Sequence, residues 1–206
     1  AYLKESLGLK IIYDVPNVPQ VMPRLVARGQ EPVHKRLAEI IDAGPYIDIY
    51  WVKTEKDKKK LVELGVENTK IKVRTPGIDL ENKKFIPRTQ LKEPIRSIYL
   101  GNLHYPPNKE GLVMLRNTRK TCKSKDIHID IDVVGDGPIE KMRKKFPQLN
   151  FLGIKPDLNK ALKSYELAFA CPTYGSGISL KVLDYMAAGI PTVTNKVGIR
   201  GHKKEI

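Results

Sequence analysis

A glycine-rich loop followed at once by an apolar helix is the stretch of this sequence whose residue types could do chemistry. Residues 173–193 read TYGSGISLKVLDYMAAGIPTV. Gly175 and Gly177 allow the backbone to approach a ligand closely and to adopt positive φ. The helix predicted over 178–188 then presents free N–H groups and the positive end of its dipole. This combination predicts an anion site, best suited to a phosphate or a diphosphate.

Two charged side chains near the start of that helix would complete the site. Lys181 lies within about the first turn and would place a cation beside the phosphates. Asp184 follows three residues later, so the two side chains share one helix face. A carboxylate is poor for phosphate but can accept hydrogen bonds from both hydroxyls of a ribose. From these residues alone, a plain turn followed by a surface ion pair is an equally good interpretation.

The bulk composition bounds the class of protein. The 206 residues carry a net charge of +14, which would suit nucleic acid, ligand phosphates or an anionic membrane surface. Most of the lysines fall on the polar faces of predicted helices, so solvated surface is the favoured explanation and nucleic acid is not expected as a partner. No apolar stretch reaches membrane-spanning length, and no signal peptide is visible. Together with two isolated cysteines, Cys122 and Cys171, this predicts a cytoplasmic protein.

Strand-like and helix-like segments alternate along the chain. Predicted strands cover 10–15, 46–52, 70–75, 95–101, 127–135, 149–153, 166–172 and 190–194. Predicted helices cover 31–44, 54–65, 106–122, 137–146, 157–165 and 178–188. Strands separated by helices imply an α/β fold with doubly wound parallel sheets and right-handed crossovers.

The rhythm breaks once, in a polar stretch with two prolines at 80–94. We therefore predict the end of a first Rossmann-like domain at 1–80, a linker at 81–94 and a second such domain at 95–206. Ligands of such sheets bind outside the carboxyl ends of the strands. That rule selects the loops at 101–108, 135–138, 153–157 and 172–177.

Residues 175–201, GSGISLKVLDYMAAGIPTVTNKVGIRG, resemble the nucleotide-binding signature of the retaining "group 1" glycosyltransferases of GT-B fold. VVGDGP at 133–138, YLGNLHYPPNKEGL at 99–112 and the segment 52–79 resemble further family motifs in the same order. The resemblance covers nearly the whole chain. It implies a donor-binding C-terminal domain preceded by the end of the acceptor-side domain.

The resemblance assigns roles to the loop and helix already singled out. Asp184 falls where the family has the glutamate that holds the nucleotide ribose. Ser176 stands where most members have a glutamate that contacts the donor sugar, which is a departure. Gly175, Ser176, Gly177 and Ile178 would supply backbone amides to the diphosphate or the sugar, and Lys181 would lie close to the phosphates.

Two further loops take roles from the same resemblance. The nucleobase would lie at residues 153–157, where the backbone of Ile154 and Lys155 could read its edge. Many members bind the diphosphate with an arginine and a lysine after the first strand of this domain. Here Gly101 and Asn102 begin that loop, and Asn108 and Lys109 follow, which is a second departure.

The activity that the resemblance implies is sugar transfer from a nucleoside-diphosphate sugar to an acceptor, with retention at the anomeric carbon. Amides, a helix dipole and cations could neutralise the leaving group, so no metal or other cofactor is expected. The acceptor could be a glycan, a lipid-linked or a small molecule, and a peripheral contact with the inner membrane face stays open. The catalytic residues are unknown, because the family's catalytic and acceptor-binding residues lie mostly in a half that we expect this chain to lack. A non-catalytic scaffold of the same fold and a GT-B nucleotide-sugar epimerase are the alternatives.

Overall fold

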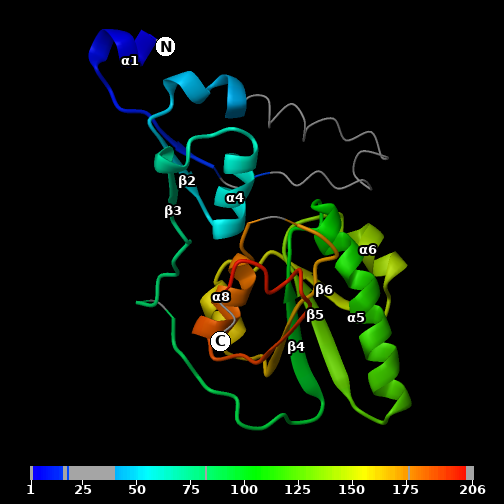
Figure 1. Cartoon of the computed structure of the whole chain (residues 1–206). Helices are drawn as coiled ribbons and strands as arrows, with labels where there is room; N and C mark the ends of the chain where they lie inside the picture. The colour runs from blue at the N-terminus through cyan, green and yellow to red at the C-terminus, as the bar shows by residue number, and fades with distance from the viewer. Residues whose placement is uncertain (1, 16–17, 19–39, 82, 176, 203–206) are drawn as a thin grey trace. The chain divides into compact units, whose positions relative to one another are not determined.

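The computed structural model describes residues 2–15, 18, 40–81, 83–175 and 177–202 (Figure 1). The chain forms two compact units. The first comprises Ala1–Pro76 with Ser176–Ile178 and Arg200–Ile206, and the second comprises Gly77–Gly175 with Ser179–Ile199. The predicted domain boundaries remain a prediction, although the division after Pro76 lies close to the predicted end of the first domain at residue 80.

The first unit holds a parallel sheet of three strands in the order β1-β2-β3: Ile12–Asp14, Ile49–Val52 and Ile71–Val73. Helix α1 (Tyr2–Leu7), which the sequence analysis did not predict, precedes β1, and α4 (Glu55–Glu63) connects β2 to β3. Short 3-10 helices occupy Gly44–Tyr46 and Asn68–Lys70. Most of the helix predicted over 31–44 lies outside the described residues, and residues 40–42 are helical.

Helix α4 shows how its sequence fixes its ends. The side chain of Thr54 accepts a hydrogen bond from the backbone N–H of Asp57 at 3.0 Å, which caps the first turn. Leu61 faces the core and is fully buried. Gly65 ends the helix with φ +90, a conformation that disfavours any side chain. The helix predicted over 54–65 is therefore confirmed, with Thr54 as its N-cap and Gly65 just beyond its end.

The second unit is a five-stranded sheet in which every paired strand is parallel, in the order β6-β5-β4-β7-β8. Its strands are β4 (Ile95–Leu100), β5 (Ile129–Val134), β6 (Asn150–Gly153), β7 (Leu167–Ala170) and β8 (Thr192–Thr194). Its helices are α5 (Pro106–Ser124), α6 (Ile139–Lys145), α7 (Leu158–Leu162) and α8 (Leu180–Ala187). The predicted Rossmann-like α/β fold is confirmed.

Helices cover both faces of this sheet, with α5 and α6 on one side and α8 on the other (Figure 1). Strand β4 shows why, because its side chains alternate between two separate cores. Tyr99 packs with residues of α5 and α6, whereas Ile98 and Leu100 pack with residues of α7 and α8. A strand buried on both faces is typical of a central strand in a parallel sheet.

Residues 77–94, which lead into β4, belong to the second unit and run along its helices α7 and α8. Arg88 makes most of the contacts. Its half-buried guanidinium donates to the backbone carbonyls of Ile86, Leu162, Lys163, Tyr165 and Ala188. Three of these lie just after the last residues of α7 and α8, where helix carbonyls lack partners and a cation is favourable.

We expect Arg88→Met to lower the free energy of unfolding by about 2–3 kcal/mol. The substitution keeps much of the aliphatic stem but removes the hydrogen bonds that Arg88 donates to several partly buried carbonyls, and each such loss is costly. Urea denaturation followed by circular dichroism measures this change. Arg116→Met is the matched control, because Arg116 bonds only the side chain of its neighbour Asn117 and should cost less than about 0.5 kcal/mol. Equal losses in the two variants would contradict this role of Arg88.

Candidate functional site

A cavity of about 360 Å³ opens at the carboxyl ends of β4, β5 and β6. The strand order reverses beside β4, between β4 and β7, and in such sheets ligands bind at this point. Loops and helix starts line the cavity. The lining residues are Leu100, Gly101, Asn102, Asn108, Val134, Gly135, Ile154, Lys155, Leu158, Lys181 and Asp184.

Two glycines form the part of the cavity between β4 and β5. The N–H of Gly101 donates to the carbonyl of Val134 at 3.0 Å, and the N–H of Gly135 donates to the carbonyl of Gly153 at 2.9 Å. Gly135 has φ +144, and a Cβ there would overlap the carbonyl oxygen of Gly101 and lie 2.8 Å from its carbonyl carbon. Only glycine fits this crossing, so the two backbones form the wall of the cavity directly.

Lys181, the second residue of α8, reaches toward the loop after β4. Its Nζ donates to Asn108 Oδ1 at 3.0 Å and lies 4.5 Å from the centroid of the Tyr99 ring. The amide of Asn108 in turn donates to the carbonyl of Asn102 at 3.0 Å. The Lys181 ammonium, which lines the cavity, is thus held by the face of the Tyr99 ring and by the Asn108 side chain. Both partners are uncharged, so neither neutralises its positive charge.

Burial keeps the reactive groups beneath this cation protonated. It raises the pKa of Tyr99 and of Tyr185 far above the ordinary range of tyrosine. Burial also raises the pKa of the Cys171 thiol. These hydroxyls instead serve structure, since Tyr185 accepts from the N–H of Leu100 at 2.7 Å and Tyr99 donates to the carbonyl of Asn108 at 3.0 Å. Burial therefore disfavours the ionised forms of Tyr99, Tyr185 and Cys171, which makes them poor candidates for a base or a nucleophile.

Asp184, on the same face of α8, is held by a residue that the sequence analysis missed. Lys83 Nζ lies 2.9 Å from Asp184 Oδ1 and 2.9 Å from Asn159 Oδ1. Lys83 belongs to the polar segment that was predicted as a linker, 101 residues away along the chain. No local pattern in that segment signals this contact.

The structure brings six of the ten predicted site residues to this one cavity. They are Gly101, Asn102, Ile154, Lys155, Lys181 and Asp184. Gly175 belongs to the second unit but does not line the cavity, and Ser176 lies outside the described residues. Gly177 and Ile178 group with the first unit, and Gly177 has the left-handed φ, +66, that favours glycine. The binding roles of all ten remain predictions.

The start of α8 differs from the prediction. The helix begins at Leu180, with Ser179 as its extended N-cap residue, rather than at residue 178. Gly177 has a left-handed φ of +66, which does not belong to a right-handed helix, so the first helical turn can begin only after this residue. Lys181 consequently stands at the second helical position, closer to the N-terminal end of the helix than was expected.

Histidine and aspartate side chains elsewhere in the second unit lie apart from this cavity. The exposed His104 lies 3.9 Å from Asp136, and neither lines the cavity. Asp130 lies beside Arg119, whereas Asp132 accepts from Tyr165, so these two aspartates have different partners. Within the part of the chain that the structure describes, no group of three or more His, Cys, Asp or Glu residues could hold a metal ion.

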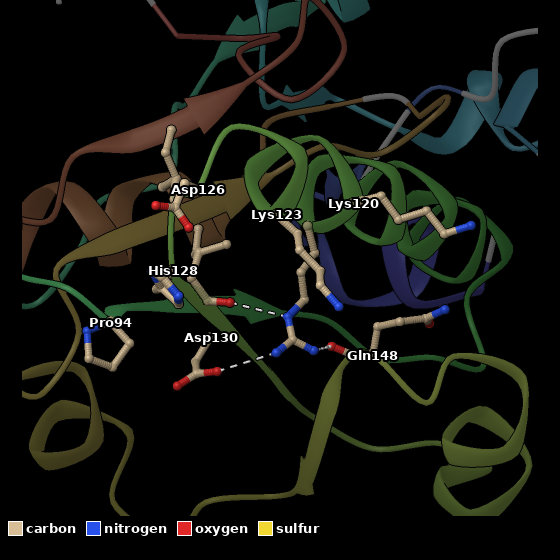
Figure 2. Close-up of a pocket in the computed structure, with 10 residues that line it drawn as sticks. Pro94, Lys120, Lys123, Asp126, His128, Asp130 and Gln148 are labelled. Atoms are coloured by element: carbon tan, nitrogen blue, oxygen red, sulfur yellow. Dashed lines mark hydrogen bonds and ion pairs between the residues drawn. The ribbon is translucent and has the colours of Figure 1, made fainter.

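A second cavity, of about 480 Å³, lies at the amino ends of the strands, where β5 begins (Figure 2). Figure 2 shows Lys120 and Lys123 at its rim and Asp130 below them. Arg119, the arginine of this cavity, is committed to structure: its Nε donates to the Ile129 carbonyl at 3.2 Å and another nitrogen donates to the Gln148 carbonyl. Because the amino ends of parallel strands seldom bind the ligand of such sheets, the first cavity is the better candidate site.

The family model of the glycosyl transferases of group 1 matches residues 94–205. A comparison with curated proteins finds no match. Among solved structures, Anabaena Alr3699/HepE in complex with UDP-glucose aligns with a TM-score of 0.71 at 16% identity, over 95% of this chain and 56% of that one. The pneumococcal O-GlcNAc transferase GtfA, in complex with UDP and GlcNAc, aligns with a TM-score of 0.69 at 14% identity, over 95% of this chain and 39% of that one.

WaaG, a glycosyltransferase involved in lipopolysaccharide biosynthesis, aligns with a TM-score of 0.63 at 15% identity, over 97% of this chain and 63% of that one. The chain therefore spans less than two thirds of the length of each of these structures. Identities this low show a shared fold. Among the described helices, none is both long enough and apolar enough to span a membrane.

Proposed function

We propose that this chain, which belongs to the glycosyl transferases of group 1, carries the donor site of an enzyme that moves a sugar from a nucleoside-diphosphate sugar to an acceptor. One observation carries the proposal. The cavity at the switch point of the second sheet gathers a cation, Lys181, and a carboxylate, Asp184, from one face of α8. A diphosphate and the ribose diol of one nucleotide need these two groups side by side.

Different residues of the cavity would bind the diphosphate, the ribose and the base of the nucleotide. Lys181 and the positive end of the α8 dipole would bind the diphosphate. Asp184 would accept hydrogen bonds from the ribose hydroxyls. The exposed side chain of Ile154 and the backbone of Ile154 and Lys155 would meet the base. The amide of Gly175, which belongs to the same unit as the cavity, would add a contact to the diphosphate or the sugar.

The reaction needs charge neutralisation more than it needs acid or base groups on this part of the chain. When the bond between the anomeric carbon and the phosphate oxygen breaks, negative charge develops on the departing diphosphate. Lys181 and the Gly175 amide would stabilise that charge without a metal. An acceptor hydroxyl would form the new bond to the anomeric carbon and pass its proton to the oxygen of the departing diphosphate. We propose that the configuration at that carbon is retained.

The bound ligands of the structural neighbours favour one nucleotide for the first test. HepE has been solved with UDP and with UDP-glucose, and GtfA with UDP and GlcNAc. Both are similar to this chain in fold, so we propose a uridine diphosphate sugar as the donor. The acceptor, whether a glycan, a lipid-linked or a small molecule, would meet the donor at the open side of the cavity.

The proposal is tested by thermal denaturation with UDP, GDP, ADP, CDP and dTDP. Ligand that binds only the folded state raises the melting temperature, by about 2.7 kcal/mol of stability at 100 times Kd, which corresponds to roughly 5 °C or more for a chain of this size. We expect one nucleotide to raise it and Asp184→Ala to abolish the rise. Glu140→Ala, which removes an exposed carboxylate on α6, is the control and should keep the rise. No rise with any nucleotide at millimolar concentration would favour a non-catalytic scaffold of the same fold.

A further inference from the structure

We infer that Lys83 is a positioning residue for the nucleotide site, which holds the Asp184 carboxylate in the orientation that accepts the ribose hydroxyls. The inference rests on the proposed function and names a residue outside the cavity that acts through one of its lining residues. It assigns a binding role to a residue of the polar segment 81–94, which was predicted as a linker.

The contact geometry ties three elements together at one ammonium group. Lys83 Nζ donates to Asp184 Oδ1 on α8 and to Asn159 Oδ1 on α7, each at 2.9 Å. Asn159 directly follows Leu158, which lines the cavity. The ammonium therefore fixes the position of the Asp184 carboxylate relative to both helices that border the cavity.

Burial separates this ion pair from ordinary surface pairs. The side chain of Lys83 is 11% exposed and that of Asp184 is 27% exposed. An exposed lysine pair contributes little because water screens it and the long side chains lose conformational entropy. Lys83 is already restricted by its surroundings, and its charge is screened less, so the pair is better able to hold one geometry.

The backbone that carries Lys83 is itself anchored. Three residues later, the N–H of Ile86 donates to the carbonyl of Ala188 at 3.3 Å. Gly189, with φ +70, allows this approach, because a Cβ there would lie 2.6 Å from the carbonyl oxygen of Ile86. Arg88 adds its contacts to the carbonyls of Leu162, the last residue of α7, and of Ala188, directly after α8. The ammonium thus reaches Asp184 from a fixed support.

The pairing leaves the carboxylate able to bind a ligand. Lys83 takes Oδ1, while an ionised carboxylate has two oxygens and about four acceptor positions. The adjacent cation also offsets the repulsion between Asp184 and a diphosphate a few ångströms away. The positive charge of Lys83 would therefore allow Asp184 to bind the ribose while phosphates bind on the same helix face.

Discrimination against 2′-deoxyribose tests the inference. Kd values of UDP, GDP, ADP and CDP and of their 2′-deoxy counterparts would be measured by isothermal titration calorimetry for the full chain and for Lys83→Met. In the wild type we expect the ribonucleotide of the preferred base to bind about tenfold more tightly than its deoxy form. In Lys83→Met we expect this ratio to fall below about threefold, mostly through weaker binding of the ribonucleotide.

Two further variants separate positioning from general stability. Lys84→Met removes the exposed neighbouring lysine and should keep the wild-type ratio. Lys83→Arg retains the cation and should restore a ratio above that of Lys83→Met. A merely structural role would weaken the ribo and deoxy forms equally.

The outcomes separate the inference from its foundation. If the wild type discriminates and Lys83→Met keeps the same ratio, the role of Lys83 is overturned while the nucleotide site stands. If the wild type binds a ribonucleotide no better than its deoxy form, the ribose role of Asp184 and the positioning role of Lys83 fall together. If the wild type binds none of the eight nucleotides, the proposed function falls and this assignment falls with it.

Discussion

Replacement of Gly135 by alanine is expected to lower the free energy of unfolding of the second unit by about 3 kcal/mol or more, and to abolish nucleotide binding. Gly135 crosses Gly101 so closely that an added Cβ would lie 2.8 Å from the Gly101 carbonyl carbon and closer still to its oxygen. Backbone cannot move aside as a flexible side chain can, so either β4 or β5 must shift at its carboxyl end. Both glycines line the cavity, and such a shift would deform it.

The matched control is Gly153→Ala, at the end of the neighbouring strand β6. Gly153 has φ +67, so alanine is strained there too, but nothing lies within 4 Å of an added Cβ. Only the left-handed backbone term applies, about 1–2 kcal/mol. Urea denaturation of both variants and calorimetric titration with the nucleotide that the wild type binds measure the two effects. If both variants lost the same stability and kept the same affinity, close backbone approach would not be what the Gly135 position requires.

Much of the fold was predictable because the information is local. Helix α4 is signalled by its threonine cap and its closing glycine, and the capping bond of Asp157 to the Lys160 N–H marks the start of α7 in the same way. Strand β4 reads as apolar on both faces because it is covered by helices on both faces. The boundaries differ by a few residues, as at α8, where loop geometry rather than periodicity decides the first turn.

The segment 77–94 was not predictable, because its contacts join residues far apart in sequence. Arg88 bonds carbonyls 74 to 100 residues away, and Lys83 bonds a carboxylate 101 residues away. Its prolines and charges are those of a linker, and composition alone cannot show what a charged side chain meets after folding. In the structure, Arg88 bonds carbonyls at the ends of α7 and α8, and Lys83 bonds side chains of the same two helices.

The candidate site was likewise predictable where the information is local and not where it depends on tertiary packing. The rule that ligands bind at the carboxyl ends of parallel strands, applied to predicted strands, selected the loops that hold Gly101, Asn102, Ile154 and Lys155. Lys181 and Asp184, which line the same cavity, were singled out from the helix after the glycine-rich loop. It could not show that Tyr99, a core residue of β4, lies under the ammonium of Lys181. That contact depends on how closely α5 and α8 approach β4, which follows from tertiary packing.

Lys181→Met is expected to weaken UDP binding by about ten- to a hundredfold while changing uridine binding less than about threefold. The lysine stands at the second position of α8, where its charge adds to the positive end of the helix dipole that would receive the diphosphate. A charge-assisted hydrogen bond to phosphate contributes about 1.5–3 kcal/mol, and uridine has no phosphate to lose it. Methionine keeps an unbranched stem over the Tyr99 ring, so the packing beneath the site is largely preserved.

Two comparisons make this difference specific to the diphosphate. Lys160→Met removes the same charge from an exposed position on the adjacent helix α7, outside the cavity, and should leave both affinities within about twofold of the wild type, since screened surface charge has little effect at physiological salt. Raising the salt concentration should weaken UDP binding to the wild type and have less effect on Lys181→Met, because the cation that responds to screening is gone. Equal losses for UDP and uridine would mean that Lys181 supports the fold of the loop instead. An unchanged affinity for UDP would mean that the diphosphate does not bind beside Lys181. The glycine-rich loop would then be better explained as a plain turn.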